Sequence, residues 1–358
     1  MENFRFGCTC NCFRYRILSL YKPLPRRRFC DKQRRRRLSY YIMNAKELFM
    51  NGEFLPAERG VISVRTHAFA YGTGCFEGIR GYWNKEDKQV YLFRLREHYE
   101  RLHRSCRVLQ IVLPYTVEQL IEITAELVRR NDQHEDVYLR PVAYKGGEML
   151  GVRLHDVPNH FLLTSEPQGD YVPMSGLRCG VSSWRRLDDN ALPARAKVTG
   201  GYVNAALAKS EAMQNGFDEA IMLTHEGNVS EGSAENIFLV ENGEFVTPAP
   251  TENILLGVTR DTVMKLGQRE LGYTTHERVI DRTELYNADE MFLCGTGAQI
   301  APVISVDHRP IGTGVVGPVG EKLQALYFDV VRGKHPDYRE QWCTPVYANV
   351  TQHSEAID

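Results

Sequence analysis

The sequence predicts an α+β protein of two domains with mixed helices and strands, and three observations support this. The 358 residues are enough for one large domain or two ordinary ones. Hairpins and amphipathic helices mix in both halves of the chain. Between the halves, the segment EPQGDYVPMSGL has the Pro and Gly residues of a linker. We therefore expect domains at 43–170 and 178–347, joined by a linker at 171–177.

The strands of the first half are indicated by apolar runs and turn residues. Residues 47–56 predict a hairpin, because Asn51-Gly52 is a two-residue turn between two apolar runs. Residues 60–83 predict a strand, a tight Gly-rich turn and a second strand. Two further strands are expected, one opening the segment 89–111 and one at 136–146.

Two helices are expected beside these strands, each with an apolar face at helical spacing. The first follows the strand that opens 89–111, and its inner face is Leu95, Tyr99, Leu102 and Cys106. The second covers 116–132, begins at Thr116 and Glu118, and is lined by Leu120, Ile121, Leu127 and Val128.

The second half repeats this mixture of elements. Strands are expected at 178–184 and on both sides of a loop within 288–307. Residues 219–248 predict a β meander with turns at Glu226-Gly227-Asn228 and Asn242-Gly243. One helix is expected at 202–216, closed by its final glycine, and another begins near Gly257. A dinucleotide-binding fold is disfavoured, because no GxGxxG opens a helix after a strand and no Walker loop occurs.

The charge of the chain is unevenly distributed. Residues 1–42 carry 12 Lys/Arg against 2 acidic residues, whereas the other 316 carry 32 against 43. The basic arm resembles an organelle transit peptide in being Arg-rich and acid-poor, but it has only two serines and its arginines are clumped. We expect the arm not to be part of the functional fold, with Met43 as a plausible start. A transit peptide, a metal site or a nucleic-acid-binding segment are the alternatives. Residues 348–358 are expected to form a C-terminal tail.

Composition excludes several classes of protein. No run of 18 apolar residues exists, so we expect no membrane span. Five isolated cysteines, Cys75, Cys106, Cys179, Cys294 and Cys343, are typical of buried, reduced thiols in an intracellular protein. The CTCNC run of the arm lacks the CxxC spacing of a zinc site, and we expect no metal. The expected location is the cytoplasm.

Two lysines on either side of Gly200-Gly201 raise the question of a catalytic amine. Lys209 lies within a predicted helix and is interpreted as a solvated lysine of the helix face. Lys197 instead precedes the helix, between Pro193 and the glycines. A lysine nucleophile needs a shielded site that lowers its pKa, and glycines let the backbone approach a bound ring.

Other segments are suited to a phosphate and to a ring nitrogen. Gly257-Val258-Thr259 opens a helix whose free N–H groups favour an anion, and Gly295-Thr296-Gly297 offers a hydroxyl and further N–H groups. Arg101 could add a cation. If the cofactor is pyridoxal phosphate, a carboxylate must keep its ring nitrogen protonated, and the residues leave Glu231 and Glu235 as alternatives.

Taken in order, these motifs resemble one enzyme family. Four segments of the second half are similar to fold-type IV aminotransferases: AKVTGGYVNAALAKSEA, GFDEAIMLTHEGNVSEGSAENIFLV, GVTRD and GTGAQIAPV. Three segments of the first half are similar to the same family: HAFAYGTGCFEGIRGY, LFRLREHYERLHRS and VYLRPVAY. The resemblance runs from about Met43 to Tyr347. More narrowly, these segments resemble the bacterial branched-chain amino acid aminotransferases. It implies a two-domain fold, like that of D-amino-acid aminotransferase, with pyridoxal 5'-phosphate at the domain interface.

The resemblance also implies roles for residues around the cofactor. Lys197 binds it covalently and moves the proton between Cα and C4′. Glu231 faces the ring nitrogen, which leaves Glu235 a structural role, and Tyr202 bonds the phenolic oxygen. The remaining implied cofactor residues are Arg101, Val258, Thr259 and Thr296 at the phosphate and Leu255 on the ring.

Substrate recognition is implied in the same way. The pocket must accept a branched side chain in one half-reaction and the γ-carboxylate of glutamate in the other. Arg140 would bind that γ-carboxylate, because a guanidinium fork matches it. The implied aromatic walls are Tyr71, Phe76, Tyr171 and Tyr202, and the α-carboxylate would meet Tyr138 and the backbone of Thr296 and Gly297. An alanine is common at the position of Gly297, so the pocket size differs slightly.

The implied reaction is reversible transfer of the amino group of L-leucine, L-isoleucine or L-valine to 2-oxoglutarate by a ping-pong mechanism. A homodimer is implied, sometimes assembled further, without nucleic acid or membrane. The alternatives are a D-amino-acid aminotransferase, an aminodeoxychorismate lyase or an R-selective amine transaminase of the same fold. A noncatalytic protein with a nucleic-acid-binding arm is the alternative from another class. The pattern Lys-x-x-Gly-Gly-x-x-Asn that begins at Lys197 and the sequence YLRP favour the branched-chain enzyme.

Overall fold

The computed structural model describes residues 45–169 and 175–347. The predicted arm, the predicted tail and residues 170–174 of the linker region lie outside the described residues. The described residues belong to one compact unit by their contacts, and they form two β-sheets. The division into domains around 171–177 therefore stays a prediction.

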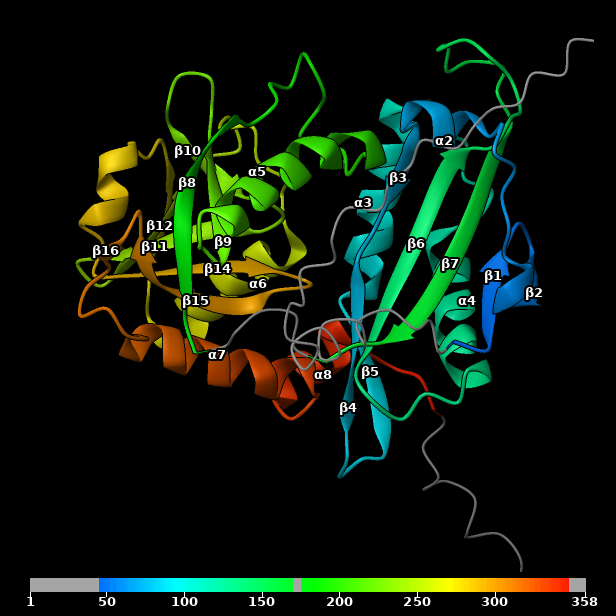
Figure 1. The fold of residues 1–358 in the computed structure, drawn as a ribbon. Helices are drawn as coiled ribbons and strands as arrows, with labels where there is room; N and C mark the ends of the chain where they lie inside the picture. Colours follow the sequence, from blue (N-terminus) through cyan, green and yellow to red (C-terminus); the bar gives the residue numbers. More distant parts are fainter. Residues whose placement is uncertain (1–44, 170–174, 348–358) are drawn as a thin grey trace, which may run out of the picture. The chain divides into compact units, whose positions relative to one another are not determined.

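The first sheet pairs its strands antiparallel in the order β17-β5-β4-β6-β7-β1-β2, with β3 also on β6 (Figure 1). Its strands are β1 (Glu47–Met50), β2 (Glu53–Pro56), β3 (Gly74–Phe76), β4 (Ile79–Asn84), β5 (Gln89–Phe93), β6 (Val137–Lys145), β7 (Asn159–Pro167) and β17 (Cys343–Pro345). The predicted hairpin at 47–56 is confirmed, with positive φ at both turn residues, Asn51 and Gly52. The strand β17 pairs with β5 although it lies in the second predicted domain.

Helices α3 (Leu95–Val108) and α4 (Val117–Arg130) pack on this sheet, beside the short α2 (His67–Tyr71) and η2 (Ala57–Arg59). The predicted inner face of α3 is confirmed, because all four of its apolar residues are buried. The predicted start of α4 is confirmed as well. Thr116 caps the helix and exchanges hydrogen bonds with Gln119 in a capping box.

The second sheet has the order β10-β9-β8-β15-β14-β11-β12-β13, with β16 on β15. Strand β8 runs parallel to β9 and β15, and β12 runs parallel to β13. The strands are β8 (Leu177–Arg185), β9 (Glu219–Leu223), β10 (Val229–Gly232), β11 (Asn236–Glu241), β12 (Glu244–Pro248), β13 (Thr275–Arg278), β14 (Glu290–Gly295), β15 (Gln299–Val306) and β16 (Arg309–Pro310).

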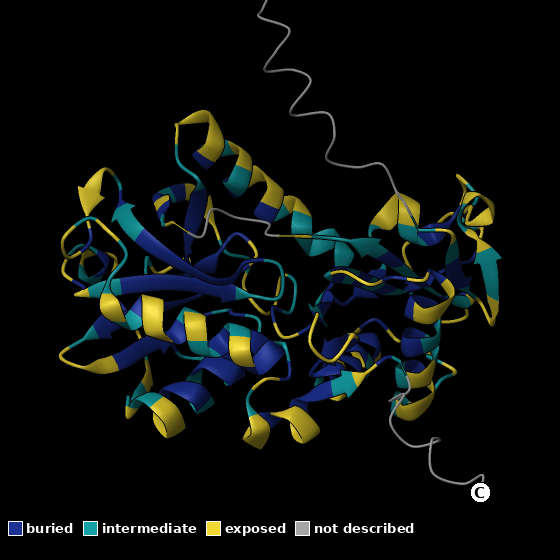
Figure 2. Cartoon of the chain, turned by 90° about the horizontal axis from the view of Figure 1, so that it is seen from below, coloured by how far each residue is buried: buried dark blue, intermediate teal, exposed yellow. Residues whose placement is uncertain are grey.

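Helices cover this sheet and leave their outer sides exposed (Figure 2). Helix α5 contacts β8 and β9, whereas α6 and α7 contact β14, which places a core of aromatic and branched side chains between helices and strands. The helices are α5 (Tyr202–Gln214), α6 (Val258–Leu266), α7 (Pro318–Val331) and α8 (Pro336–Trp342), with short turns η3 (Thr199–Gly201), η4 (Gly267–Leu271) and η5 (Arg282–Tyr286). None of the helices within the described ranges is long and apolar enough to cross a bilayer.

Two expected elements differ in the structure. The first strand expected in 60–83 does not form, because Val61 and Val64 are exposed and 67–71 coils into α2. The expected meander is broken between β10 and β11, because β11 pairs with β14 instead of β10. Strand propensity predicted the strands within 219–248, but the partner of each strand depends on contacts distant in sequence.

Candidate active site

The backbone of Lys197 is held by two elements of the first sheet and its helices, β3 and α3. Its amide N donates to Ser105 Oγ at 3.1 Å, and its carbonyl accepts from the amide of Phe76 at 3.0 Å. The following residue, Val198, forms a β-bridge with Cys75. These contacts hold the lysine against β3 and α3, so the direction of its side chain is set by both.

The side chain of Lys197 points into an aromatic cluster. Its Nζ donates to Tyr202 Oη at 2.6 Å and lies 5.0 Å from the centre of the Phe76 ring. No carboxylate lies within 4.0 Å of Nζ among the residues that the structure describes. The Phe76 and Tyr202 rings are in edge contact, with centroids 4.7 Å apart. The amine is therefore half-buried and held by a phenol.

The glycines around Lys197 bring two backbone segments together. A Cβ on Gly72 would lie 2.8 Å from the Cα of Gly200, and Gly72 has a φ of +67°. The amide of Gly200 donates to the carbonyl of Gly72 at 3.1 Å. A side chain at Gly72 would separate the β3 segment from the start of α5, so this position needs glycine for close packing.

Arg140 and Tyr138 join the same cluster because of strand geometry. They are two residues apart on β6, so their side chains lie on one face of the sheet. Arg140 Nη2 donates to Tyr138 Oη at 2.8 Å, and the guanidinium lies 4.5 Å from the Phe76 ring centre. The structure thus brings together Lys197, Tyr202, Phe76, Arg140 and Tyr138, as the sequence predicts.

Glu231 lies on β10 as a buried carboxylate with three donors. Arg186 Nη2 approaches one oxygen at 2.6 Å, while Asn236 Nδ2 and the amide of Leu255 each donate to the other at 3.0 Å. A carboxylate offers about four lone-pair sites, so one remains. Burial raises the pKa of Glu231, against the opposing effects of Arg186, the Leu255 amide and Lys197.

Arg186 is a residue that the sequence reasoning missed, because a basic pair at a strand end carries no distinctive signal.

Glu235 lies among other charges. Burial, followed by the charge of Glu219, raises the pKa of Glu235 to about 8. Lys209 Nζ contacts Glu219 and donates to the carbonyl of Asp218 at 2.7 Å. The interpretation of Lys209 as a solvated lysine is therefore wrong, because the charge of a buried acid holds it against the sheet.

The residues expected at a phosphate lie on three segments. Val258 and Thr259 are the first residues of α6, where amides have no acceptor within the helix. Arg101 on α3 is tied to this helix start, because its Nη1 donates to the carbonyl of Leu256 at 2.8 Å. Thr296 is half-buried in the turn between β14 and β15.

The turn after Thr296 is held by a residue that sequence reasoning missed. Arg80 on β4 is buried and reaches the carbonyl of Gly297 at 3.4 Å, and it also donates to the carbonyls of Gln168 and Gly169 at 2.6 and 2.8 Å. Arg80 is paired in register with Tyr138. The Thr296-Gly297 turn is thereby connected to the strand that carries Tyr138 and Arg140.

One predicted aromatic wall, Tyr71, is not part of this cluster. Tyr71 is 37% exposed, and its hydroxyl accepts from the amide of Gly151 at 3.1 Å. Its ring packs on His67, with centroids 4.7 Å apart. Tyr71 is thus bonded to the loop after β6. Tyr171 lies outside the described residues.

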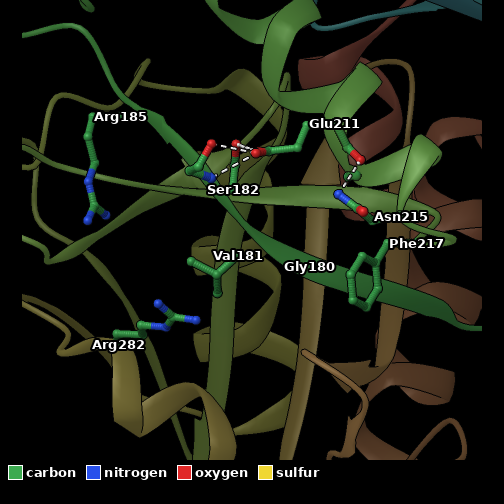
Figure 3. A pocket seen from close by; sticks show the side chains of 10 residues that line it. Gly180, Val181, Ser182, Arg185, Glu211, Asn215, Phe217 and Arg282 are labelled. Carbon is green, nitrogen blue, oxygen red and sulfur yellow. Dashed lines mark hydrogen bonds between the residues drawn. The ribbon is translucent and has the colours of Figure 1, made fainter.

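A separate pocket of about 270 Å³ opens beside β8 and α5 (Figure 3). Glu211 at its edge accepts from Ser182 Oγ at 2.5 Å and from the amide of Ser183 at 2.9 Å. Its other charged lining residues are Arg185 and Arg282. None of the residues predicted for the site lines this pocket.

Comparison with known proteins identifies the family of this chain. Residues 74–306 match the family model of amino-transferase class IV. A probable branched-chain-amino-acid aminotransferase of Aquifex aeolicus is 49% identical over 300 residues, which cover 84% of this chain and 96% of that protein.

Solved structures give the same result. The branched-chain amino acid aminotransferase of Thermobaculum terrenum, in its PLP-form, matches with a TM-score of 0.82 and 39% identity over 86% of this chain and 100% of that one. The branched-chain aminotransferase of Thermoproteus uzoniensis with norvaline matches with a TM-score of 0.81 and 41% identity over 85% of this chain and 100% of its own. Since the family model, the relatives and the solved structures all agree, the chain belongs to the class IV aminotransferases.

Proposed function

We propose that this enzyme uses pyridoxal 5'-phosphate to exchange amino groups between L-leucine, L-isoleucine or L-valine and 2-oxoglutarate, reversibly and in two half-reactions. The observation that carries the proposal is the contact of Lys197 Nζ with Tyr202 Oη beside Phe76 and Arg140. An amine, an apolar ring and a guanidinium in one cluster can serve both substrates. The names of the relatives support the same substrate class.

The residues present fit the cofactor at both of its ends. Glu231 has one lone-pair site left for a ring N–H, and Lys197 presents an amine without a carboxylate partner in the described part of the chain. The start of α6 offers amides to a phosphate beside Arg101. When bound, the cofactor supplies a protonated ring that accepts the electrons released as the Cα–H bond breaks.

Each residue then has a defined task. Lys197 removes the proton from the substrate Cα in one half-reaction and returns a proton to Cα in the other. Tyr202 holds Nζ on the reacting face, while Glu231 keeps its charge facing the ring nitrogen. The cofactor phosphate, which is remote from the reacting carbon, would be held by Arg101, Val258, Thr259 and Thr296. Binding at this distant group aligns the Cα–H bond with the amine.

The pocket can treat the two substrates differently because Arg140 lies on an aromatic ring. The Phe76 face gives a branched side chain apolar surface, and the guanidinium above it is free to meet a γ-carboxylate with a two-pronged pair of hydrogen bonds. Tyr138 bonds Arg140 at 2.8 Å and so limits its movement. The α-carboxylate is assigned to Tyr138 and the backbone of Thr296 and Gly297, with Leu255 against the ring.

Arg140→Ala is expected to lower kcat/KM for L-glutamate by about 10²-fold and that for L-leucine by no more than about 10-fold, because loss of a half-buried, hydrogen-bonded partner of a carboxylate costs about 2–3 kcal/mol. Steady-state kinetics with each amino acid measures the ratio. Arg140→Lys is the control, since it keeps a charge but not the fork. Equal losses for both substrates would show that Arg140 only supports the pocket wall.

The absorbance spectrum of the purified enzyme tests the proposed function directly. We expect a visible band from cofactor bound to Lys197 that L-leucine alone bleaches, with release of the 2-oxo acid, and that 2-oxoglutarate restores. D-alanine alone should leave the band unchanged. Bleaching by D-alanine only would assign the D-amino-acid branch of the family instead. The absence of any band after addition of pyridoxal phosphate would reject the proposal.

We also propose that the enzyme is a homodimer and works in the cytoplasm. The loop after β6 carries two apolar side chains, Leu150 and Val152, that are 92% and 74% exposed. Gly151 between them is held by His67 at 2.9 Å through its carbonyl and by Tyr71 through its amide. The loop is thus clamped with both side chains outward, as a subunit contact would need.

Five buried free cysteines support a reducing compartment.

The combined change Leu150→Asp and Val152→Asp is expected to shift the enzyme from dimer to monomer, because it places charges in an apolar contact. Sedimentation velocity measures the change. If these side chains also complete the site of the partner, activity with L-leucine should fall by about tenfold or more. Exposed Val315, replaced by Asp, is the control for surface charge alone. A dimer that survives the double change would place the interface elsewhere.

A further inference from the structure

Glu77 is a fully buried carboxylate that makes three charge-assisted contacts behind the cluster of Lys197. It is 0% exposed and directly follows Phe76 at the end of β3. Arg101 Nε reaches one of its oxygens at 2.7 Å, and Arg101 Nη2 reaches the other at 2.7 Å. His98 Nδ1 lies 2.8 Å from that second oxygen.

The three side chains have fixed places on their elements. His98 and Arg101 are three residues apart on α3 and therefore share one face of the helix. The amide of Glu77 donates to the carbonyl of Pro141 at 3.0 Å, which holds the residue on β6 as well. The three groups therefore join α3 to the strands that carry Phe76 and Arg140.

The charges of the three groups are set by their burial. Burial raises the pKa of Glu77, but Arg101 and the hydrogen bonds from Arg101 and His98 outweigh it, so the pKa is well below its ordinary value. Burial lowers the pKa of His98, against the opposing effect of Glu77. Glu77 is thus an anion, Arg101 a cation and His98 neutral, and the positive charge of Arg101 is fully balanced inside the protein.

The donors of Arg101 are largely committed by these contacts. A guanidinium has five N–H groups. Two are directed at Glu77, and a third is directed at the carbonyl of Leu256, two residues before the start of α6. Two N–H groups remain for a ligand, judged by the contacts of the described residues. Their direction is fixed, because the other three cannot be rotated without breaking buried hydrogen bonds.

We propose that Glu77, supported by His98, is a positioning residue for the cofactor phosphate. It fixes the rotamer of Arg101, so that the two remaining N–H groups and the start of α6 present one rigid set of donors. It acts through Arg101 and does not itself contact the cofactor. This inference rests on the proposed function, in which Arg101 binds that phosphate.

Glu77→Gln tests the proposal by cofactor binding to the apoenzyme. The change keeps the size of the side chain but places an NH₂ donor against the donors of Arg101 or His98. We expect the Kd for pyridoxal phosphate, from titration of the apoenzyme, to rise by about tenfold, as expected for loss of one charge-assisted contact. The ³¹P resonance of the bound cofactor should shift or broaden, because the phosphate meets a mobile guanidinium.

Asp136→Asn is the matched control for loss of an acid that pairs with arginine. Asp136 accepts from both terminal nitrogens of Arg332, at 3.1 and 2.9 Å, and none of its partners is placed in the site. This variant should unfold at a lower temperature yet keep the wild-type Kd and ³¹P resonance. A purely structural Glu77 would behave like it, with an unchanged resonance and a Kd within about twofold of wild type, and that result would overturn the proposal.

Glu77→Asp serves if the glutamine variant does not fold. It keeps the charge, but its side chain is too short to bond Arg101 twice and His98 once. We expect a Kd raised several-fold, and a wild-type Kd would overturn the proposal. Failure of the proposed function is distinguishable: without pyridoxal phosphate chemistry the wild-type apoenzyme itself would not bind the cofactor, and with another substrate class the wild type would bind it but L-leucine would not bleach its band.

Discussion

Lys197→Ala is expected to lower the transamination rate with L-leucine by at least about 10⁴-fold, the upper range for loss of a positioned proton-transfer group, since covalent attachment is lost as well. Nothing in the cluster replaces the amine: the group nearest to its place is the hydroxyl of Tyr202, bonded to Nζ at 2.6 Å. The formation of 2-oxo acid measures activity. Mass spectrometry after borohydride reduction measures covalent attachment, which should disappear.

Arginine substitutions at the two lysines make a matched pair of controls. Lys197→Arg should be as inactive as the alanine variant, because a guanidinium keeps its proton at any working pH. Lys209→Arg should keep near wild-type activity, because arginine can still pair with the buried acid Glu219. Turnover by Lys197→Arg within about tenfold of wild type would mean that another group carries the proton.

The parts of the site that could be predicted from sequence are those in which a local pattern fixes a direction. The family resemblance implied Tyr138 and Arg140, and their two-residue spacing on β6 places them on one face. The glycine before Val258 and Thr259 marks a helix start, and the structure begins α6 at Val258. Periodicity of four apolar residues on α3 likewise predicted which face of that helix is buried.

The partners of the buried charges could not be predicted in the same way. Glu77 pairs with a residue 24 positions away, and Arg186 meets Glu231 across 45 positions. A sequence pattern reports which side of an element is buried, but it does not report which other element arrives there. Sequence reasoning proposed Arg101 as a cation for the phosphate, and the structure adds a carboxylate partner, Glu77.

Some residues that the sequence assigned to a strand or to the pocket remain exposed among the described residues. The run GVISV predicts a strand by its β-branched residues, yet Val61 and Val64 remain exposed and pair with no strand among the described residues. Tyr71 was expected in the pocket but bonds to Gly151 in the loop that carries Leu150. All of these apolar positions are consistent with a subunit contact, which one chain cannot display.

Glu231→Gln is expected to leave pyridoxal phosphate bound while lowering the rate of proton removal from L-leucine by about 10²- to 10³-fold, the usual cost of losing one charge placed to stabilise a transition state. The charge of Arg186, 2.6 Å from the present carboxylate, then faces the ring nitrogen without a counter-charge. Arg186 would oppose protonation of the ring, so the electrons from the Cα–H bond lose their acceptor. Stopped-flow absorbance with α-deuterated L-leucine measures this step, and the isotope effect should increase as proton removal becomes rate-limiting.

Glu235→Gln is the control that separates the two acids. Because burial and Glu219 raise the pKa of Glu235 to about 8, this side chain carries a proton at neutral pH and a glutamine resembles it closely. Activity at about pH 7 should therefore stay near wild type. Because the folded-state pKa of Glu235 is raised, the free energy of unfolding of the wild type falls as the pH rises from about 5 to 8, and Glu235 stabilises the fold least above about pH 8. The Glu235→Gln variant should lose less free energy of unfolding over this range. A wild-type rate in Glu231→Gln together with a large loss in Glu235→Gln would assign the ring-nitrogen role to Glu235. Only an ionised carboxylate can keep the ring nitrogen of the cofactor protonated, and glutamine carries no such charge.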